Sequence, residues 1–247
     1  MIKYIVLGII QGLTEFLPVS SSGHLVIAQD ILGFTSDGIA VSIVLHLGTL
    51  VAVIIFFLKD IMLAFRDLKL AGFILLTTFI TGSIGLVGRS FFESLFSSSR
   101  LSIVALFVTG VVLLFTRNYS FGSKKEIKLK DGIILGFTQA LAIIPGISRS
   151  GVTISTLLFR GLNKETCFKL SFLVSIPLIL GASILELEKI DFALQYNSVN
   201  ILLGFISSLI SGLLALFLLK LVIVKAKFYY FGYYCIFIAL LFFIFIK

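Results

Sequence analysis

Residues 11–25 have the sequence QGLTEFLPVSSSGHL, a polar stretch within a strongly apolar chain. Gln11 and Glu15 are four residues apart, which puts both side chains on one face of a helix. Pro18 ends that helix, because proline lacks an N–H group and its ring obstructs the preceding turn. The apolar segment 4–33 is therefore predicted to form two short helices that meet at a polar turn.

The start of the second short helix has the features of an anion site. Ser20, Ser21 or Ser22 can cap this helix. Gly23 lets another group approach the backbone closely, and His24 falls in the first turn. A helix start also offers free N–H groups and partial positive charge, and the two together favour a bound anion.

A second polar stretch, PGISRSGVT at 145–153, repeats this plan within the apolar segment 131–160. Pro145 and Gly146 break the chain, and Arg149 adds a guanidinium group that can bind phosphate through parallel hydrogen bonds. If the two turns face each other, the ensemble suits a phosphate group better than a sugar, a metal cluster or a peptide. The further candidate phosphate-binding residues are Ser148, Ser150, Gly151 and Thr153.

The composition identifies the class of protein. Apolar residues make up 59% of the 247 residues and charged residues 13%, whereas soluble domains have roughly 25% charged residues. The mean hydropathy is +1.17, which indicates an integral membrane protein. The net charge of +8 comes without a basic block, so we expect no nucleic-acid partner. Cys167 and Cys235 lack metal-site spacing, so neither a disulfide nor a cysteine metal site is expected.

The apolar runs predict an all-α polytopic membrane protein. A spanning helix needs about 20 mostly apolar residues. Segments broken by Pro, Gly and Ser are tolerated at membrane depth only where they line a cavity or are buried in protein. We therefore predict two re-entrant helical hairpins at 4–33 and 131–160 beside six transmembrane helices at about 41–58, 70–88, 101–116, 167–185, 198–219 and 228–246.

The charged loops predict the orientation, because positive loops face the cytoplasm. The segment 117–130 has five basic residues against Glu126 alone, and 220–227 has three lysines, so both should be cytoplasmic. The loop 59–69 gives a weaker cytoplasmic signal, and the acidic loop 186–191 should lie outside. These assignments agree only if the first hairpin enters from outside, the second enters from the cytoplasm, and both chain ends lie outside.

The two halves of the chain resemble each other at a constant offset of about 128 residues. Gln11 is matched by Gln139 in this alignment, and the spans 70–88 and 101–116 also have counterparts. An odd number of spans separates the hairpins, so the second half should be inverted. We predict a single domain over 1–247 with inverted repeats at approximately 1–120 and 129–247, an architecture that places a polar site between the repeats.

Several of these residues have simpler explanations. Serines before apolar runs are usually plain helix caps, and an isolated Arg149 could be an anchor at the membrane interface. Glu15 is harder to explain in this way, because buried carboxylates in lipid are rare and usually functional. His46, inside a span, either touches the site or packs against a neighbouring helix. The tyrosines at 229–234 are typical of an interfacial aromatic belt.

QGLTEFLPVSSSGH and PGISRSG resemble the two signature motifs of the undecaprenyl-pyrophosphate phosphatase family associated with bacitracin resistance. The first motif has the form Glu/Gln-x-x-x-Glu followed by Pro-x-Ser-Ser-x-Gly-His, and the second is Pro-Gly-x-Ser-Arg-Ser-Gly. The resemblance extends through LHLGTLVAV at 45–53 and RGLNKETCFKLSFLVSIP at 160–177, so it covers most of the chain.

This resemblance implies an enzyme of the bacterial cytoplasmic membrane that removes one phosphate from undecaprenyl diphosphate and so recycles the lipid carrier of wall-polymer synthesis. It also implies a divalent cation, Mg²⁺ or Ca²⁺, with Glu15 as a metal residue. Because position 11 is Gln, the pair has one carboxylate fewer than in members with Glu. The implied catalytic residues are Glu15, Ser21, His24 and Arg149, with Gln11, Ser148 and Thr153 alongside.

The chemistry leaves two nucleophiles open. Ser21, activated by His24, could form a phosphoserine, or a water deprotonated by His24 or Glu15 could attack directly. We expect the reaction at the outer face of the membrane, with the lipid tail among the helices, and a homodimer is possible. The alternative functions are a lipid flippase or a secondary transporter of a phosphorylated substrate, since inverted repeats with broken helices are a transporter architecture. An accessory membrane subunit would not need the two polar stretches.

Overall fold

The structure is a computed structural model that describes residues 1–34, 38–95, 98–118, 122–124, 126–186, 197–225 and 227–245. Within these ranges every extended regular element is a helix. The α-helices are α1 (Ile2–Phe16), α2 (Ser21–Ile31), α3 (Gly38–Phe56), α4 (Leu58–Ala64), α5 (Leu68–Val87), α6 (Arg89–Leu95), α7 (Ser99–Phe115), α8 (Leu129–Ala140), α9 (Arg149–Phe159), α10 (Lys164–Leu173), α11 (Ser175–Glu186), α12 (Ser198–Val224) and α13 (Tyr230–Phe245). The all-helical class predicted from the sequence is confirmed for this part of the chain.

Both interrupted segments are broken where the sequence predicts. The first consists of α1 and α2, which are separated by the turn that contains Pro18. The second consists of α8, a short 3₁₀ helix (Leu141–Ile143) and α9, and its turn contains Gly146 at a φ of 96°. In the following text, hairpin 1 means α1 and α2 with their turn, and hairpin 2 means α8 and α9 with theirs.

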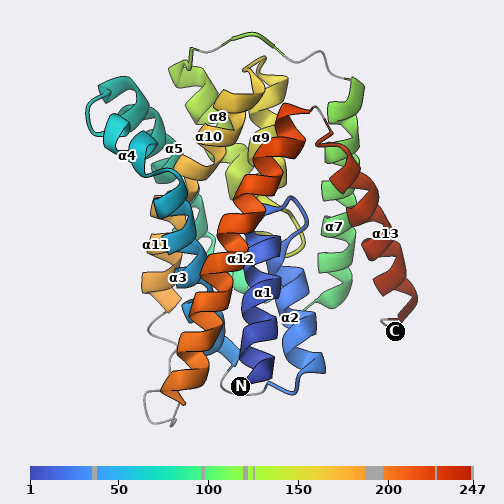
Figure 1. Cartoon of the computed structure of the whole chain (residues 1–247). Helices are drawn as coiled ribbons and strands as arrows, with labels where there is room; N and C mark the ends of the chain where they lie inside the picture. The colour runs from blue at the N-terminus through green and yellow to red at the C-terminus, as the bar shows by residue number, and fades with distance from the viewer. Residues whose placement is uncertain are drawn as a thin grey trace.

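The two hairpins approach the middle of the helix bundle from opposite ends. In Figure 1, α1 and α2 occupy the lower part of the bundle, and α8 and α9 the upper part. The start of α1 lies near the lower end and the end of α13 in the lower half, whereas the end of α7 and the start of α8 lie at the upper end (Figure 1). The turns of the hairpins are therefore brought together inside the protein.

Helices cover most of each of the six stretches that were predicted to span the membrane, and the stretch 167–185 is divided between α10 and α11. By length and composition, three helices of the described ranges could cross a membrane, or up to five if each bent pair counts as one span. One bent pair is α3 with α4, whose axes differ by 75°. Parts of the span and loop predictions rest on residues outside the described ranges, namely Lys125, Glu188, Lys189, Asp191 and residue 246.

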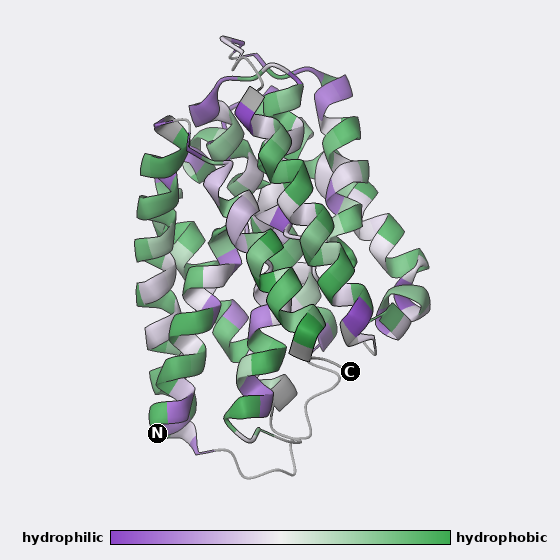
Figure 2. Cartoon of the chain, turned by 90° about the vertical axis from the view of Figure 1, so that its right-hand side faces the viewer, coloured by the Kyte–Doolittle hydropathy of each residue, from purple (hydrophilic) through white to green (hydrophobic). Residues whose placement is uncertain are grey.

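Apolar side chains dominate the outside of the bundle. Large hydrophobic residues such as Phe79, Val87 and Ile244 are more than two-thirds exposed. Figure 2 shows hydrophobic residues along the outer helices and hydrophilic ones mainly toward the two ends, with the upper end the most hydrophilic. An outer surface of this kind is stable in lipid and would aggregate in water. The protein is therefore a multi-pass membrane protein.

Small residues allow the hairpins to pack closely against long helices. A Cβ atom on Gly12 of α1 would lie 2.7 Å from the backbone nitrogen of Gly212 in α12. In the other half, a Cβ atom on Gly136 of α8 would lie 2.8 Å from Cβ of Ile80 in α5. Such small-residue contacts are typical of membrane helix pairs. The pairs α1–α12 and α8–α5 correspond at the predicted offset, and the repeat itself stays a prediction.

Candidate functional site

The turns of the two hairpins are joined by an ion pair between Glu15 and Arg149. The guanidinium Nη2 of Arg149, the first residue of α9, donates to Oε1 of Glu15 at 2.6 Å. The two side chains are 17% and 8% exposed. A buried carboxylate needs a paired cation or several hydrogen bonds to stay charged in such surroundings. Two residues that sequence analysis assigned to different segments therefore form one polar centre.

The second oxygen of Glu15 accepts two further hydrogen bonds. The hydroxyl of Ser21 donates to Oε2 at 2.7 Å, and Nε2 of Gln11 donates to the same atom at 3.1 Å. Nε2 of His46 lies 3.7 Å from it. Of the two explanations for His46, contact with the site is the one observed. A carboxylate this close to a hydroxyl can orient it and can accept its proton.

Two polar atoms of this centre have no partner in the described part of the chain. They are Nη1 of Arg149 and Oε1 of Gln11, and both are buried. Cζ of the guanidinium group lies 6.0 Å from the ring centroid of Phe172, so this ring covers one side of the group. Buried polar atoms are rarely left without a partner. The free N–H groups of Arg149 are therefore available to an oxyanion.

The turn of hairpin 1 has an unusual backbone. Ser20, which precedes α2, has a φ of 65°, a region that non-glycine residues seldom adopt and that often marks functional sites. Its side chain makes no capping bond to the helix; its hydroxyl lies 3.3 Å from that of Ser22. The expectation that a serine caps this helix holds for the position of Ser20 and not for its side chain. The first N–H groups of α2 consequently stay free for an anion.

The turn of hairpin 2 is held more firmly. The hydroxyl of Ser148 accepts from the N–H of Gly151 at 3.2 Å and so caps α9 as predicted. The N–H of Ser148 donates to the hydroxyl of Thr109 in α7 at 3.1 Å. Thr153 shares a 2.6 Å hydrogen bond with Ser171 of α10. A Cβ atom on Gly151 would lie 3.3 Å from Pro18 Cβ, so the two turns are in close contact.

His24 lies beside this centre and has partners of its own. Its Nδ1 is 2.9 Å from the carbonyl oxygen of Ser20, and its Nε2 is 2.8 Å from the hydroxyl of Tyr234 in α13. The hydroxyl of Ser21 is bonded to Glu15, and both ring nitrogens of His24 have other partners. In this conformation Ser21 and His24 are therefore not hydrogen-bonded to each other through their side chains.

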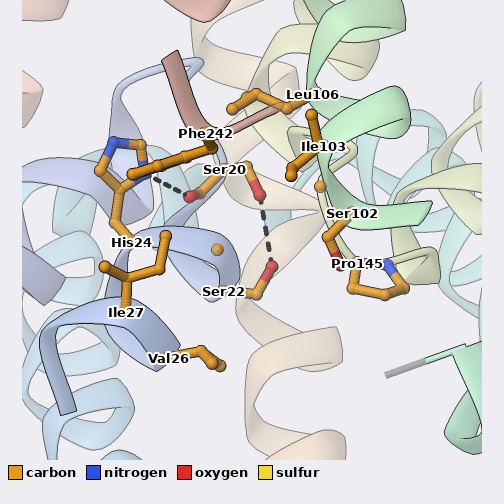
Figure 3. A pocket seen from close by; sticks show the side chains of 12 residues that line it. Ser20, Ser22, His24, Val26, Ile27, Ser102, Ile103, Leu106, Pro145 and Phe242 are labelled. Atoms are coloured by element: carbon orange, nitrogen blue, oxygen red, sulfur yellow. Dashed lines mark hydrogen bonds between the residues drawn. The ribbon is translucent and has the colours of Figure 1, made fainter. Parts of the chain in front are cut away.

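A cavity opens next to His24 between the two turns and the helices α7 and α13. Figure 3 shows the hydroxyl groups of Ser20 and Ser22 and the ring of His24 on one side, facing Ser102 and Pro145. The rest of its lining is largely apolar: Gly23, Val26, Ile27, Ile103, Leu106, Gly146 and Phe242. The cavity thus combines a polar side with an apolar remainder.

Gln139 and Ser150 complete the set of predicted site residues. Gln139, the counterpart of Gln11, is buried and donates to the hydroxyl of Thr81 in α5 at 3.3 Å. Among the described residues, no hydrogen bond joins Gln139 to Glu15. Ser150 is buried, and its hydroxyl lies 3.3 Å from that of Ser148.

Three residues near the site were not found from the sequence. Thr109 and Ser171 support hairpin 2, and the tyrosine cluster that suggested an interfacial belt supplies Tyr234 to His24. Single polar residues inside long apolar helices were the available signal, because each needs a partner there.

The donor atoms present are those that a hard cation prefers. Within the described ranges no group of three or more His, Cys, Asp or Glu side chains could hold a metal ion. Glu15 nevertheless offers a carboxylate, and Gln11 offers a buried oxygen without a partner. Oxygen ligands of this kind fit Mg²⁺ or Ca²⁺, provided that a ligand supplies the remaining oxygens.

Comparison with known proteins identifies the family of the chain. The profile of the family described as "Bacitracin resistance protein BacA" matches residues 4–241. A protein named undecaprenyl-diphosphatase from Methanobrevibacter smithii is 40% identical over 95% of this chain and 94% of its own length. Proteins of the same name from Thermotoga sp. (strain RQ2) and Halothermothrix orenii are 41% and 42% identical, over 96% and 94% of this chain and 97% and 93% of theirs. The profile match includes every residue of the polar centre, and matches of this extent show that the chain belongs to the BacA family.

Proposed function

We propose that this protein hydrolyses undecaprenyl diphosphate to undecaprenyl phosphate and inorganic phosphate. Relatives that match this chain over nearly their whole length are named for this activity. The observation that carries the proposal is the buried contact of Glu15 with Arg149 and Ser21, which combines a carboxylate, a guanidinium and a hydroxyl between two helix starts. The reaction recycles the lipid carrier of wall-polymer synthesis and thereby confers bacitracin resistance.

Arg149 and the two helix starts bind the diphosphate. Nη1 of Arg149 and the uncapped start of α2 offer N–H groups to phosphate oxygens. Phosphoryl transfer depends mainly on positioning and on stabilising the charge of the transition state. Bringing a guanidinium and two positive helix ends to one place supplies both.

Ser21 is the nucleophile that the geometry favours over a water molecule. Its hydroxyl is bonded to Glu15, which can take the proton as the oxygen attacks the terminal phosphorus. The bond from that phosphorus to the bridging oxygen breaks, undecaprenyl phosphate leaves, and the proton follows to the leaving oxygen. Water then hydrolyses the phosphoserine and releases phosphate. In this scheme His24 acts on the hydrolytic water, beside the cavity.

A divalent cation, Mg²⁺ or Ca²⁺, is part of the proposal. Glu15 and Oε1 of Gln11 are the residues that would hold it. When bound, it would neutralise part of the diphosphate charge. Gln139 plays a supporting role within hairpin 2, through its hydrogen bond to Thr81.

The proposed setting is the cytoplasmic membrane of a bacterial cell, with six spans, two re-entrant hairpins and the site open to the outside. Hairpin 1 lies in the same half of the bundle as the end of α13, in agreement with this orientation (Figure 1). The apolar part of the cavity between α7 and α13 offers the lipid tail a route from the headgroup to the membrane. A homodimer is also part of the proposed setting.

The test is phosphate release by the purified protein in detergent from undecaprenyl diphosphate, with and without a chelator. We expect release that stops on chelation and returns with Mg²⁺ or Ca²⁺. A phosphoserine trapped by rapid quenching should be absent in Ser21→Ala. Release without any phosphoserine would favour attack by water. No release at all would contradict the proposal and favour a flippase or a transporter, which needs no bond cleavage.

A further inference from the structure

The hydrogen bonds of His24 define which of its ring nitrogens carries a proton. A backbone carbonyl can only accept, so the nitrogen next to the carbonyl of Ser20, Nδ1, must carry a hydrogen. In the neutral ring Nε2 then has the lone pair, and the hydroxyl of Tyr234 donates to it at 2.8 Å. The two rings are stacked, with an angle of 14° between their planes.

Tyr234 is itself held against hairpin 1. The thiol of the next residue, Cys235, donates to the carbonyl oxygen of Pro18 at 3.2 Å. This bond holds the start of α13 against the turn of hairpin 1. On the other side, α13 packs tightly on α7, because a Cβ atom on Gly232 would lie 2.7 Å from the carbonyl oxygen of Gly110. The phenol therefore has a fixed position from which to hold the imidazole.

We propose that Tyr234 is a positioning residue that fixes the tautomer and the orientation of His24 for the phosphatase reaction. This inference rests on the proposed function. A phenol hydroxyl can donate and accept. It donates to Nε2 of the neutral ring. When His24 takes up the proton of the hydrolytic water, the hydroxyl passes its own proton to Nε2, receives the proton of the water in exchange, and then accepts from the N–H of the protonated ring. Both states of His24 thus keep the same orientation beside the cavity.

The residues that correspond to this pair in the predicted repeat do not form such a pair. At the offset of about 128 residues, Val152 stands for His24 and Leu106 for Tyr234. Neither replacement has a titratable group. Anchoring of α13 at the membrane interface does not require a hydrogen bond from a tyrosine to a histidine. The pairing therefore points to a role in the reaction.

The test compares Tyr234→Phe with Tyr233→Phe. Both variants lose one hydroxyl from the same helix, but the hydroxyl of Tyr233 accepts from Arg117 instead. We expect kcat to fall about fivefold in Tyr234→Phe, which is the effect of one lost hydrogen bond. KM should stay near the wild-type value, since Tyr234 does not line the cavity. Tyr233→Phe should behave as the wild type.

A second readout reports on the imidazole directly. The chain has two histidines, so ¹⁵N-labelled histidine gives two rings to observe, and His46→Gln assigns them. In Tyr234→Phe the Nε2 signal of His24 should move towards that of a nitrogen without a hydrogen bond. In Tyr233→Phe it should not move. This measurement does not depend on catalysis, so it separates a failure of this inference from a failure of the proposed function.

The role of Tyr234 through His24 also predicts how the two substitutions combine. In a His24→Ala background, Tyr234→Phe should lower the remaining rate no further. A wild-type kcat in Tyr234→Phe, an equal loss in the His24→Ala background, or an unchanged Nε2 signal would each overturn the inference. If His24→Ala has no measurable rate, the nitrogen spectrum decides.

Discussion

Glu15 accepts hydrogen bonds from three side chains, and one of them, Arg149, is 134 residues away in the sequence. Both charges are largely withdrawn from solvent. Removing one partner of a buried pair leaves the other uncompensated, whereas removing both does not. The stability of the protein should therefore reveal that the two turns meet, independently of any activity.

The residue-scale prediction is a double-mutant cycle on this pair. Glu15→Gln and Arg149→Gln should each lower the free energy of unfolding, by about 3 kcal/mol. The double variant should lose clearly less than the sum, because no charge is left unpaired. Equilibrium unfolding in mixed micelles measures all three.

The exposed pair of Arg89 and Glu93 provides the matched control. Its side chains are 43% and 48% exposed, and they lie one turn apart on α6. Glu93→Gln should change the free energy of unfolding by less than about 0.5 kcal/mol. Additive losses at Glu15 and Arg149 would mean that the turns do not meet in the membrane.

At the scale of the element, the position of hairpin 1 depends on how closely α1 approaches α12. A Cβ atom on Gly12 would lie 2.5 Å from the carbonyl oxygen of Ser208 and 2.7 Å from the nitrogen of Gly212. Both are backbone atoms, which cannot turn aside as a side chain can. Glu15 lies less than one turn further along the same helix, so a shift of α1 would carry its carboxylate with it.

Gly12→Ala should consequently lower the free energy of unfolding by about 1–3 kcal/mol and reduce phosphate release as well. Gly82→Ala in α5 is the control, since a Cβ atom there meets nothing within 4 Å. That change should be neutral or stabilise the helix by up to about 1 kcal/mol. Thermal unfolding in detergent compares the two, and equal effects would contradict the close packing of α1 on α12.

The sequence was sufficient to predict the hairpins and the residues at their turns. Pro18 and Gly146 interrupt long apolar runs, and a carboxylate and a guanidinium in lipid require each other. The orientation of His24 was not predictable in this way. It follows from the backbone of Ser20, which is held at a positive φ, and from Tyr234, which is 210 residues away. Neither leaves a local pattern in the sequence.

At the scale of the whole molecule, the proposed orientation puts hairpin 1 on the outside and the start of hairpin 2 in the cytoplasm. Asp30, near the end of α2, and Lys128, just before α8, are exposed and mark the two sides. Both natural cysteines are buried, so they can be replaced by alanine to give a cysteine-free background.

In that background, a maleimide that does not cross membranes should label Asp30→Cys in intact cells. It should label Lys128→Cys only after the cells are opened. The expected difference follows from the charge of the loops, which places 117–130 in the cytoplasm. Labelling of both positions from the same side would rule out two hairpins that enter from opposite faces.

The ion pair between the hairpins also has a consequence for the synthesis and membrane insertion of the protein. The ribosome makes hairpin 1 first, and Arg149 is added 134 residues after Glu15. During that interval the carboxylate of Glu15 lacks its cation, and an unpaired charge in the hydrocarbon region of a membrane has a high free energy. The nascent hairpin can avoid this cost only if the carboxyl group is protonated or stays in contact with water until Arg149 is in place. Docking of the second hairpin on the first then supplies the cation that the carboxylate lacks.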